Sequence, residues 1–367
     1  MRVLHVSGAS VWGGNEQQLF DLMDGLQKLQ IENILFCFKD SPVELKAKQN
    51  NINYYSIYKV KSHSLKYAKN LRACIKTYKP DVIHLHTSNT LTAFVIADVL
   101  FKLKTPTVFS KKAISAASSG LSTFKYNYKN INQIICVSKA VEDAFKNVLK
   151  SKNHQKLCVV FDGINIMDRE NKTPILLKEK YSIPTSRILI GNIANHTNAK
   201  DLVTLVKTAN ELINNLEVKN VHFLQIGKEG KQTSSFMPLI KEYNLESYFT
   251  VTGFLEDAMD LLPQFDVFLM TSEREGGPTS ILDAMYRKIP VVTTKVGLTT
   301  EAITHQKNGI LCDIKDYKSL AFNLKELILD KDKQTQFAEL SYEILINKFT
   351  AKQLAENTLL VYNNVIK

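Results

Sequence analysis

Short apolar runs alternate with longer segments of helical periodicity along almost the whole chain. Each run has the length of a β-strand, and most are followed by apolar residues spaced three and four positions apart, as on one face of a helix. Strands that alternate with helices favour parallel sheets. The predicted strands are residues 3–6, 34–38, 80–87, 106–112, 134–138, 157–161, 188–193, 221–226, 248–252, 265–270 and 289–294, and a hairpin-like turn within 308–311 leads into a last strand. The pattern predicts an α/β fold with two doubly wound parallel sheets.

A polar stretch, residues 166–184, divides this pattern into two halves. It lacks apolar periodicity and ends at Pro184, as expected of a connection. With 367 residues, the chain is long enough for two domains of ordinary size. The predicted parts are an N-terminal domain over 1–166, a linker over 167–186, a C-terminal domain over 187–347 and a closing helix over 348–367.

The most informative stretch lies between the apolar runs 265–270 and 289–294. It holds Gly276-Gly277-Pro278, then Thr279 and Ser280, which are typical N-cap residues, and then apolar residues at helical spacing. We expect a strand, a tight glycine loop, a helix and a second strand. A helix N-terminus offers unpaired N–H groups and a positive dipole end, and glycines let an anion come close. The stretch predicts a diphosphate site.

Three charged residues belong to this predicted site. Glu275 stands at the carboxyl end of a strand, where open α/β sheets bind ligands, and Asp283 lies about one turn into the following helix. One acid could face a sugar and the other a ribose, although a solvated loop acid and a helix-start acid would look the same. Lys200 precedes the apolar helix 202–209, an unfavourable place for a cation unless it serves a phosphate.

The first half offers weaker signals. The loop Gly13-Gly14-Asn15-Glu16 follows the first strand, but it is not Gly-x-Gly-x-x-Gly, so no dinucleotide site is indicated. A tight turn that opens a helix is the alternative. His84 and His86 point to the same side of their strand because strands alternate. The sequence supplies no third metal ligand, which favours histidines that line a cleft or lie in the core.

Positive charge is concentrated in the first half. Residues 1–160 carry a net charge of +13 and residues 161–367 a net charge of −2. In the amphipathic segment 64–79, basic residues recur at helical spacing one step along from an apolar stripe. A solvated helix face is one interpretation, and docking on an anionic membrane surface is the other.

Composition restricts the class of protein. Hydrophobic residues make up 44% of the chain and charged residues 23%, as in globular proteins, and no apolar run is long enough to span a bilayer. The N-terminus is expected to be a first strand rather than a signal peptide. The five cysteines are scattered without a Cys-x-x-Cys pair, which indicates free thiols in a reducing cytoplasm.

These segments, taken in order, resemble the retaining glycosyltransferases of family 4, in the GT-B superfamily. The resemblance rests on Glu275 and Asp283 with seven residues between them, on the Gly-Gly-x-Glu loop at 13–16, on the Pro-Asp-Val-x-His-x-His strand from Pro80, and on Val296-Gly297. It covers nearly the whole chain. It implies the GT-B architecture, in which two Rossmann-like domains face a central cleft and a terminal helix crosses back to the first domain.

The resemblance also implies roles for individual residues. Glu275 and Lys200 would be catalytic. The donor-binding residues would be Gly14, Asn195, Lys200, Gly227, Phe254, Gly276, Gly277, Thr279, Ser280 and Asp283. The acceptor-binding residues would be Asn15, His86 and Lys112.

At several positions the chain differs from the family pattern. The departures are Asp283 for glutamate, Lys112 for a histidine that often touches the sugar, Asn195 for an arginine that grips the diphosphate, Asp201 and Leu298 for glycines, and Asp162 for asparagine. His196, Lys228 or Arg274 could supply the positive charge that Asn195 lacks.

The resemblance implies transfer of a hexose or N-acetylhexosamine from a nucleotide diphosphate sugar, with UDP favoured, and retention at the anomeric carbon. The acceptor would be a glycan or lipid-linked molecule in capsule or lipopolysaccharide biosynthesis. We expect no cofactor and, without an Asp-x-Asp near a strand end, no essential metal. We expect a cytoplasmic protein, peripheral at the inner face of the membrane, with no nucleic-acid partner.

Three other functions remain open at this stage. The same architecture supports a nucleotide-sugar epimerase. A non-catalytic sugar-binding or nucleic-acid-binding protein would account for the basic half and for the departures at Lys112, Asn195 and Asp283, since architecture alone does not prove activity.

Overall fold

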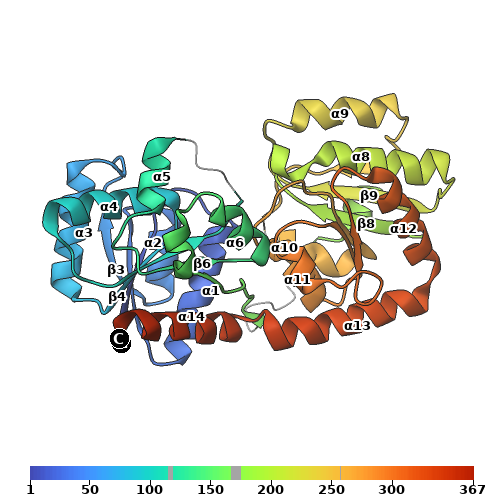
Figure 1. Ribbon diagram of the computed structural model, residues 1–367. Helices are drawn as coiled ribbons and strands as arrows, with labels where there is room; N and C mark the ends of the chain where they lie inside the picture. Colours follow the sequence, from blue (N-terminus) through green and yellow to red (C-terminus); the bar gives the residue numbers. More distant parts are fainter. Residues whose placement is uncertain (115–118, 167–174, 257) are drawn as a thin grey trace. The chain divides into compact units, whose positions relative to one another are not determined.

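The computed structural model describes residues 1–114, 119–166, 175–256 and 258–367 (Figure 1). Two compact units make up the chain. Unit 1 consists of Met1–Asn165 together with Thr350–Lys367, and unit 2 consists of Ile166–Phe349. Among the described residues, no helix combines the length and the apolar character needed to cross a bilayer.

Unit 1 is built on a seven-stranded sheet in the order β3-β2-β1-β4-β5-β6-β7, in which all paired strands are parallel. The strands are β1 (Arg2–Val6), β2 (Glu32–Phe38), β3 (Asn53–Ile57), β4 (Val82–Leu85), β5 (Thr107–Lys111), β6 (Gln133–Cys136) and β7 (Leu157–Val159). The helices are α1 (Gly14–Lys28), α2 (Pro42–Gln49), α3 (Leu65–Tyr78), α4 (Ser88–Phe101), α5 (Gly120–Tyr126), α6 (Lys139–Lys146), the 3-10 turn η1 (Ser151–Lys156) and α14 (Ala351–Ile366).

Unit 2 is built on a six-stranded parallel sheet in the order β10-β9-β8-β11-β12-β13. The strands are β8 (Ile188–Ile193), β9 (Val221–Ile226), β10 (Phe249–Val251), β11 (Val267–Met270), β12 (Val291–Thr294) and β13 (Ile310–Cys312). The helical segments are α7 (Leu177–Lys180), η3 (Asn198–Lys200), α8 (Leu202–Asn210), η4 (Glu211–Asn215), α9 (Thr233–Glu242), η5 (Ala258–Gln264), α10 (Thr279–Tyr286), α11 (Thr299–Ala302), α12 (Tyr317–Leu329) and α13 (Lys331–Lys348).

Each sheet has one point at which the strand order reverses. In unit 1 this point lies between β1 and β4, and in unit 2 it lies between β8 and β11. Connections leave such a pair of strands in opposite directions, which opens a crevice at their carboxyl ends where ligands bind in open α/β sheets. The fold thus marks two sheet edges as the places to look for a site.

The predicted linker is largely part of unit 2. Residues 167–174 lie outside the described part of the chain, but 175–186 include α7, whose Leu177 is fully buried. The Leu177 amide donates to Gln264 Oε1 at 2.8 Å, which ties this segment to η5. The segment 113–123 likewise includes 115–118, which lie outside the described residues, and its end belongs to α5.

The closing helix α14 packs in unit 1 beside α1 (Figure 1). Thr350 caps it, and its side chain accepts a hydrogen bond from the Gln353 amide. Leu354, Ala355 and Tyr362 are buried in a cluster with Leu22 and Leu26 of α1. The two helices approach closely at Gly25, where a Cβ atom would lie 2.6 Å from the Ala351 carbonyl oxygen.

We predict that Gly25→Ala destabilises unit 1 by about 1 to 2 kcal/mol, although alanine is the better helix former by about 1 kcal/mol. The added methyl would overlap the Ala351 backbone and the Ala355 Cβ, 2.7 Å away, so the helices must separate. Urea unfolding followed by Trp12 fluorescence measures this, because the only tryptophan lies in unit 1. Gly120→Ala is the control, since its Cβ meets nothing within 4 Å. A Gly25→Ala protein more stable than wild type would contradict the close approach.

Candidate active site

The predicted charged residues of unit 2 meet at the carboxyl ends of β8 and β11. The loop after β8 and the loop after β11 are joined by backbone hydrogen bonds from Glu273 N and Arg274 N to the Ala199 carbonyl, at 2.8 and 3.2 Å. Thr271 adds a third link, since its hydroxyl donates to the Asp201 carbonyl at 3.1 Å. Parallel neighbours therefore hold residues more than seventy positions apart in one place.

Lys200 and Glu275 form an ion pair across these two loops. Lys200 Nζ lies 2.6 Å from Glu275 Oε1, and the Ser272 hydroxyl donates to the same oxygen at 2.7 Å. The side chains are only 24% and 13% exposed. A partly buried, charge-assisted contact of this length fixes the direction of both groups. The site therefore presents one cation and one carboxylate side by side.

The segment after β12 packs against the glycine loop that follows Glu275. Gly297 has φ of +51°, and a Cβ there would lie 2.4 Å from the Gly276 carbonyl oxygen. The Leu298 amide donates to that same oxygen at 2.9 Å. Only glycine fits at 297, because the backbone conformation and the close approach both exclude a side chain.

Helix α10 begins directly after this loop. Its N-cap is Pro278, which has no side-chain cap, so the prediction that Thr279 or Ser280 would be the N-cap is wrong: both lie inside the first turn. Proline is extended here and continues into the helix without donating an N–H group. The Ile281 amide donates to the Pro278 carbonyl at 3.2 Å, whereas the contacts of the described residues include none from the Thr279 and Ser280 amides, which leaves these two for an anion at the helix start.

Asp283 lies within α10 and is only 2% exposed. In this structure its carboxylate is buried rather than exposed. The expected contact with a ribose stays a prediction, and it would need Asp283 to gain access to ligand.

The other predicted donor residues lie along the same edge of the sheet. A Cβ at Gly227 would lie 1.9 Å from the Ala194 carbonyl oxygen, and Asn195 Oδ1 accepts from the Lys228 amide at 2.9 Å. These contacts join the loops after β8 and β9. Phe254 follows β10 and is 69% exposed, so its ring is available to a flat partner such as a base.

His196 is not available as the missing positive charge. It is fully buried, and its two ring nitrogens lie 2.7 Å from Thr233 Oγ1 and 2.9 Å from Gln225 Oε1. Lys228 and Arg274 are exposed on the loops after β9 and β11. They remain the candidates to compensate for Asn195.

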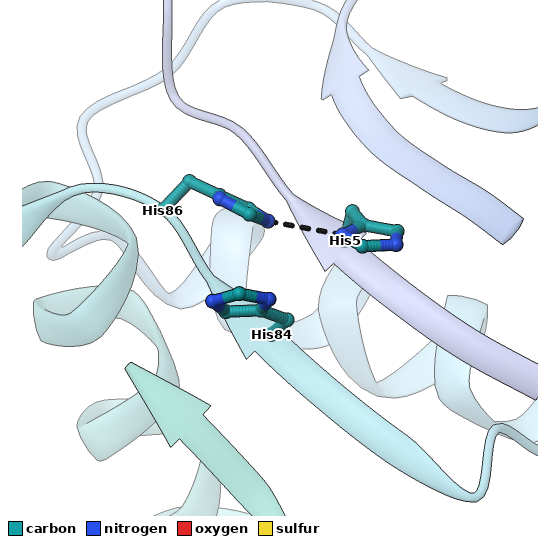
Figure 2. A group of neighbouring side chains, drawn as sticks. All are labelled: His5, His84 and His86. Carbon is teal, nitrogen blue, oxygen red and sulfur yellow. Dashed lines mark hydrogen bonds between the residues drawn. The ribbon is translucent and has the colours of Figure 1, made fainter. Parts of the chain in front are cut away.

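In unit 1, three histidines gather where β1 and β4 lie side by side (Figure 2). His84 and His86 are the pair expected from the sequence, and His5, which the sequence pattern did not single out as a third ligand, is paired with His84 in the parallel register. Ring nitrogens of the three all lie within 4.8 Å of one another. Burial lowers the pKa of His5 to about 4 and the pKa values of His84 and His86 well below their usual range, so all three are neutral near pH 7.

Lys112 and Asp162 form a nearly buried ion pair at the same edge of the sheet. Their side chains are 14% and 5% exposed, and they follow β5 and β7. Both are departures from the family pattern, and the structure shows that the two changes belong together. The next residue, Gly163, is fixed to α1 by two hydrogen bonds with the Gln18 side chain, at 2.9 and 3.0 Å.

Gly14 and Asn15 stand at the start of α1 and are exposed. With His86 and Lys112 they belong to unit 1, whereas Lys200, Glu275 and the other predicted donor residues belong to unit 2. Each unit therefore brings together its own predicted residues at the carboxyl edge of its sheet.

Comparison with known families agrees with this division. Residues 12–167 match the family described as "Glycosyltransferase Family 4", and residues 175–343 match "Glycosyl transferases group 1". The chain belongs to glycosyltransferase family 4. It is accordingly a glycosyltransferase, and the resemblance drawn from its motifs is confirmed.

Two curated relatives span most of this glycosyltransferase. N-acetyl-alpha-D-glucosaminyl L-malate synthase of Bacillus anthracis is 20% identical over 86% of the chain and 83% of its own length. The O-antigen biosynthesis glycosyltransferase WclY of Escherichia coli is 22% identical over 87% of the chain and 88% of its own length.

The fold is shared with solved glycosyltransferases. The structure of Anabaena Alr3699/HepE in complex with UDP and glucose matches with a TM-score of 0.82 and 19% identity, covering 99% of this chain and all of that one. The predicted GT-B fold class, with two parallel Rossmann-like sheets, is confirmed.

We predict that Asp162→Asn lowers the free energy of unfolding of unit 1 by about 2 to 3 kcal/mol, because it leaves the Lys112 ammonium buried without a counter-charge. The double variant Lys112→His with Asp162→Asn restores the family pattern and should recover most of this loss. Asp143→Asn is the control, since its pairing lysines are exposed and no measurable loss is expected. Urea unfolding followed by Trp12 fluorescence tests all three. Equal stability of Asp162→Asn and wild type would contradict the buried pair.

Proposed function

We propose that this glycosyltransferase moves a hexosyl or N-acetylhexosaminyl group from a UDP-sugar to a glycan or lipid-linked acceptor in surface-polysaccharide assembly, with retention at the anomeric carbon. The observation that carries the proposal is the Lys200–Glu275 pair at the strand-order reversal of unit 2. The names of the curated relatives, which include an N-acetylglucosaminyl-transferring synthase and an O-antigen enzyme, support the sugar class and the pathway.

The donor diphosphate would bind at the start of α10, against the glycine loop. The first-turn amides and the dipole attract its negative charge, and Lys200 supplies a full positive charge beside them. As the bond between the anomeric carbon and the phosphate oxygen breaks, charge grows on the leaving diphosphate. Lys200 and the helix start stabilise it, which is electrostatic catalysis.

Glu275 holds Lys200 before the donor arrives, since one carboxylate oxygen accepts from both Lys200 and Ser272. A bound diphosphate competes for the ammonium group and leaves Glu275 next to the sugar. The acceptor oxygen then bonds to the anomeric carbon on the face that the diphosphate leaves, and its proton passes to the departing phosphate oxygen. One carbon–oxygen bond breaks and another forms, and no covalent enzyme intermediate is needed.

The base is proposed to be uracil, stacked on Phe254. The Phe254 ring is exposed in the loop after β10. The carbonyl of the preceding residue, Gly253, accepts a hydrogen bond from the Gly227 amide at 3.0 Å. Stacking alone accepts any base. The solved relative that contains UDP and glucose supports the choice of uracil.

We predict that UDP raises the melting temperature and that GDP, ADP and CMP do so less. At one hundred times its Kd, a ligand adds about 2.7 kcal/mol to the stability of the fold. Lys200→Ala should weaken UDP binding by at least about tenfold, because a charge-assisted phosphate contact is lost. Thermal-shift titration measures both, with Lys241→Ala at the far end of α9 as the matched control.

Absence of a shift with every nucleotide would instead support a non-catalytic sugar-binding protein. An epimerase would be indicated by conversion of the UDP-sugar without release of UDP, whereas a transferase releases UDP only when an acceptor is present. NMR of the anomeric proton in the product decides between retention and inversion.

We also propose that unit 1 docks on an anionic membrane surface through α3. Seven basic residues and no acidic residue occur in the segment 59–80. Lys66, Lys69 and Lys76 lie on α3 with exposed side chains, on the face opposite buried Ala68 and Leu71. A row of exposed lysines without acids is attracted to anionic lipid within a Debye length.

We predict that the protein floats with vesicles containing phosphatidylglycerol but not with phosphatidylcholine alone. Replacing Lys66, Lys69 and Lys76 with glutamine should abolish flotation. Replacing Lys241, Lys318 and Lys348, which are exposed on helices of unit 2, should leave it unchanged. Equal flotation with both lipids would refute docking by charge and leave α3 as a solvated helix.

A further inference from the structure

The three clustered histidines of unit 1, His5, His84 and His86, use nearly all of their ring nitrogens within the protein. His84 is held by the Tyr362 hydroxyl at 2.6 Å and by the Ser110 hydroxyl at 2.7 Å. His5 is held by Asn33 Oδ1 at 3.0 Å and by His86 Nε2 at 3.0 Å (Figure 2). Among the contacts of the described residues, one ring nitrogen is left over, Nδ1 of His86.

Asn33 decides the direction of these hydrogen bonds. Its Nδ2 donates to the Met23 carbonyl at 2.9 Å and to the Ile31 carbonyl at 3.3 Å, so the amide nitrogen must face those oxygens. Its Oδ1 then faces His5 and can only accept. His5 Nε2 must therefore carry the proton and donate to Asn33.

The tautomer of His5 in turn determines which ring nitrogen of His86 donates. His5 is fully buried and neutral, so with its proton on Nε2 its Nδ1 carries a lone pair. His86 Nε2, 3.0 Å away, must donate to it. His86 is neutral as well, which leaves its Nδ1 without a proton.

Nδ1 of His86 is open to the outside. Among the described contacts it has no protein partner. It is not one of the fully buried polar side-chain atoms without a partner, so solvent can reach it. His86 follows β4 at the strand-order reversal of unit 1, and its amide donates to the Val6 carbonyl at 3.2 Å. The lone pair is thus offered at the edge where an open sheet binds its ligand.

We propose that Asn33, His5 and His86 form a hydrogen-bond relay that locks His86 in its Nε2–H form and presents Nδ1 to a hydroxyl of an uncharged sugar or polyol. His86 contacts the substrate, and His5 and Asn33 are positioning residues. The proposal rests on the proposed function, since the hydroxyl belongs to the glycosyl acceptor. It excludes a carboxylate or phosphate at this point, because their oxygens and the unprotonated Nδ1 are all hydrogen-bond acceptors.

A divalent metal is the other chemistry that this cluster suggests. Its ring nitrogens are close enough together, and neutral imidazole is the form that binds metal. A metal would, however, have to displace Asn33 from His5 and a hydroxyl from His84. No carboxylate belongs to the cluster to offset the buried charge. The hydrogen-bonded relay is therefore favoured, and metal binding becomes an outcome of the test.

Histidine-selective ¹⁵N NMR of the full-length protein tests the relay directly. We expect one resonance pair with a protonated Nε2 and an unprotonated Nδ1 that disappears in His86→Gln. In His5→Leu the same pair should average between the two tautomers, whereas His5→Gln, whose amide both donates and accepts, should keep it locked. A wild-type His86 protonated on Nδ1 would overturn the relay.

Two titrations of the same sample test what the lone pair binds. Saturating methyl α-D-glucopyranoside should shift the His86 Nδ1 resonance, and the effect should need about tenfold more glycoside in His5→Leu. Acetate at equal concentration, whose oxygens only accept hydrogen bonds near pH 7, should have no effect. No shift with the glycoside, or an equal shift with acetate, overturns the assignment. Stoichiometric binding of Zn²⁺ alone with shifts of all three histidines would establish a metal site instead.

These outcomes do not depend on the donor site. UDP binding is measured in unit 2 through Lys200, so a failed relay with an intact UDP response leaves the glycosyltransferase proposal standing. The converse result, a locked His86 without any nucleotide response, would leave a sugar-binding unit 1.

Discussion

The pairing of β8 with β11 is the constraint on which the site in unit 2 depends. Parallel neighbours end at the same edge, so the loops that follow them meet although a long stretch of chain separates them. Lys200 can then reach Glu275, and the Ala199 carbonyl can accept from the backbone beside it. The glycine loop and the start of α10 are positioned by the same pair of strands. A shift of β11 by one residue would turn its own buried side chains to the other face of the sheet and displace the loop that carries Glu275.

The departures from the family pattern fall into two classes. Lys112 and Asp162 compensate for one another, since the changed residues form a buried ion pair and together keep the edge of unit 1 neutral. Asn195 is different, because its side chain supports the neighbouring loop by accepting from the Lys228 amide and adds no positive charge. Lys200, paired with Glu275, is consequently the cation on which the proposed donor site relies.

The periodicity of the sequence was sufficient to predict the two parallel sheets and the helix after the glycine loop, because buried parallel strands are nearly uniformly apolar. It missed β3, a half-buried edge strand whose sequence, Asn53–Ile57, is mixed in polarity. Helix boundaries depend on local capping, which is why Pro278 rather than Thr279 precedes α10. The residues 175–186 look polar, yet they pack through two buried residues, Leu177 and Ile183, a signal too small for periodicity to detect.

Contacts between distant segments were the hardest to predict. His5 could have been added to His84 and His86 only by aligning β1 with β4 in register, which requires the strand order. The burial of Asp283 depends on what covers α10, and the pairing of Lys112 with Asp162 depends on where β5 and β7 end. Motifs identify the residue types that a site needs, whereas tertiary packing decides which of them are exposed and which are paired.

The place of α14 has a consequence for synthesis on the ribosome. Unit 2 is one continuous segment, but unit 1 is completed by residues 350–367, which are translated after unit 2. Until then Leu22 and Leu26 of α1 lack the apolar partners that α14 supplies, and His84 lacks the Tyr362 hydroxyl. Unit 2 can therefore be completed during translation before unit 1, because the cluster of unit 1 that α14 covers stays unfinished until residues 350–367 have been synthesised.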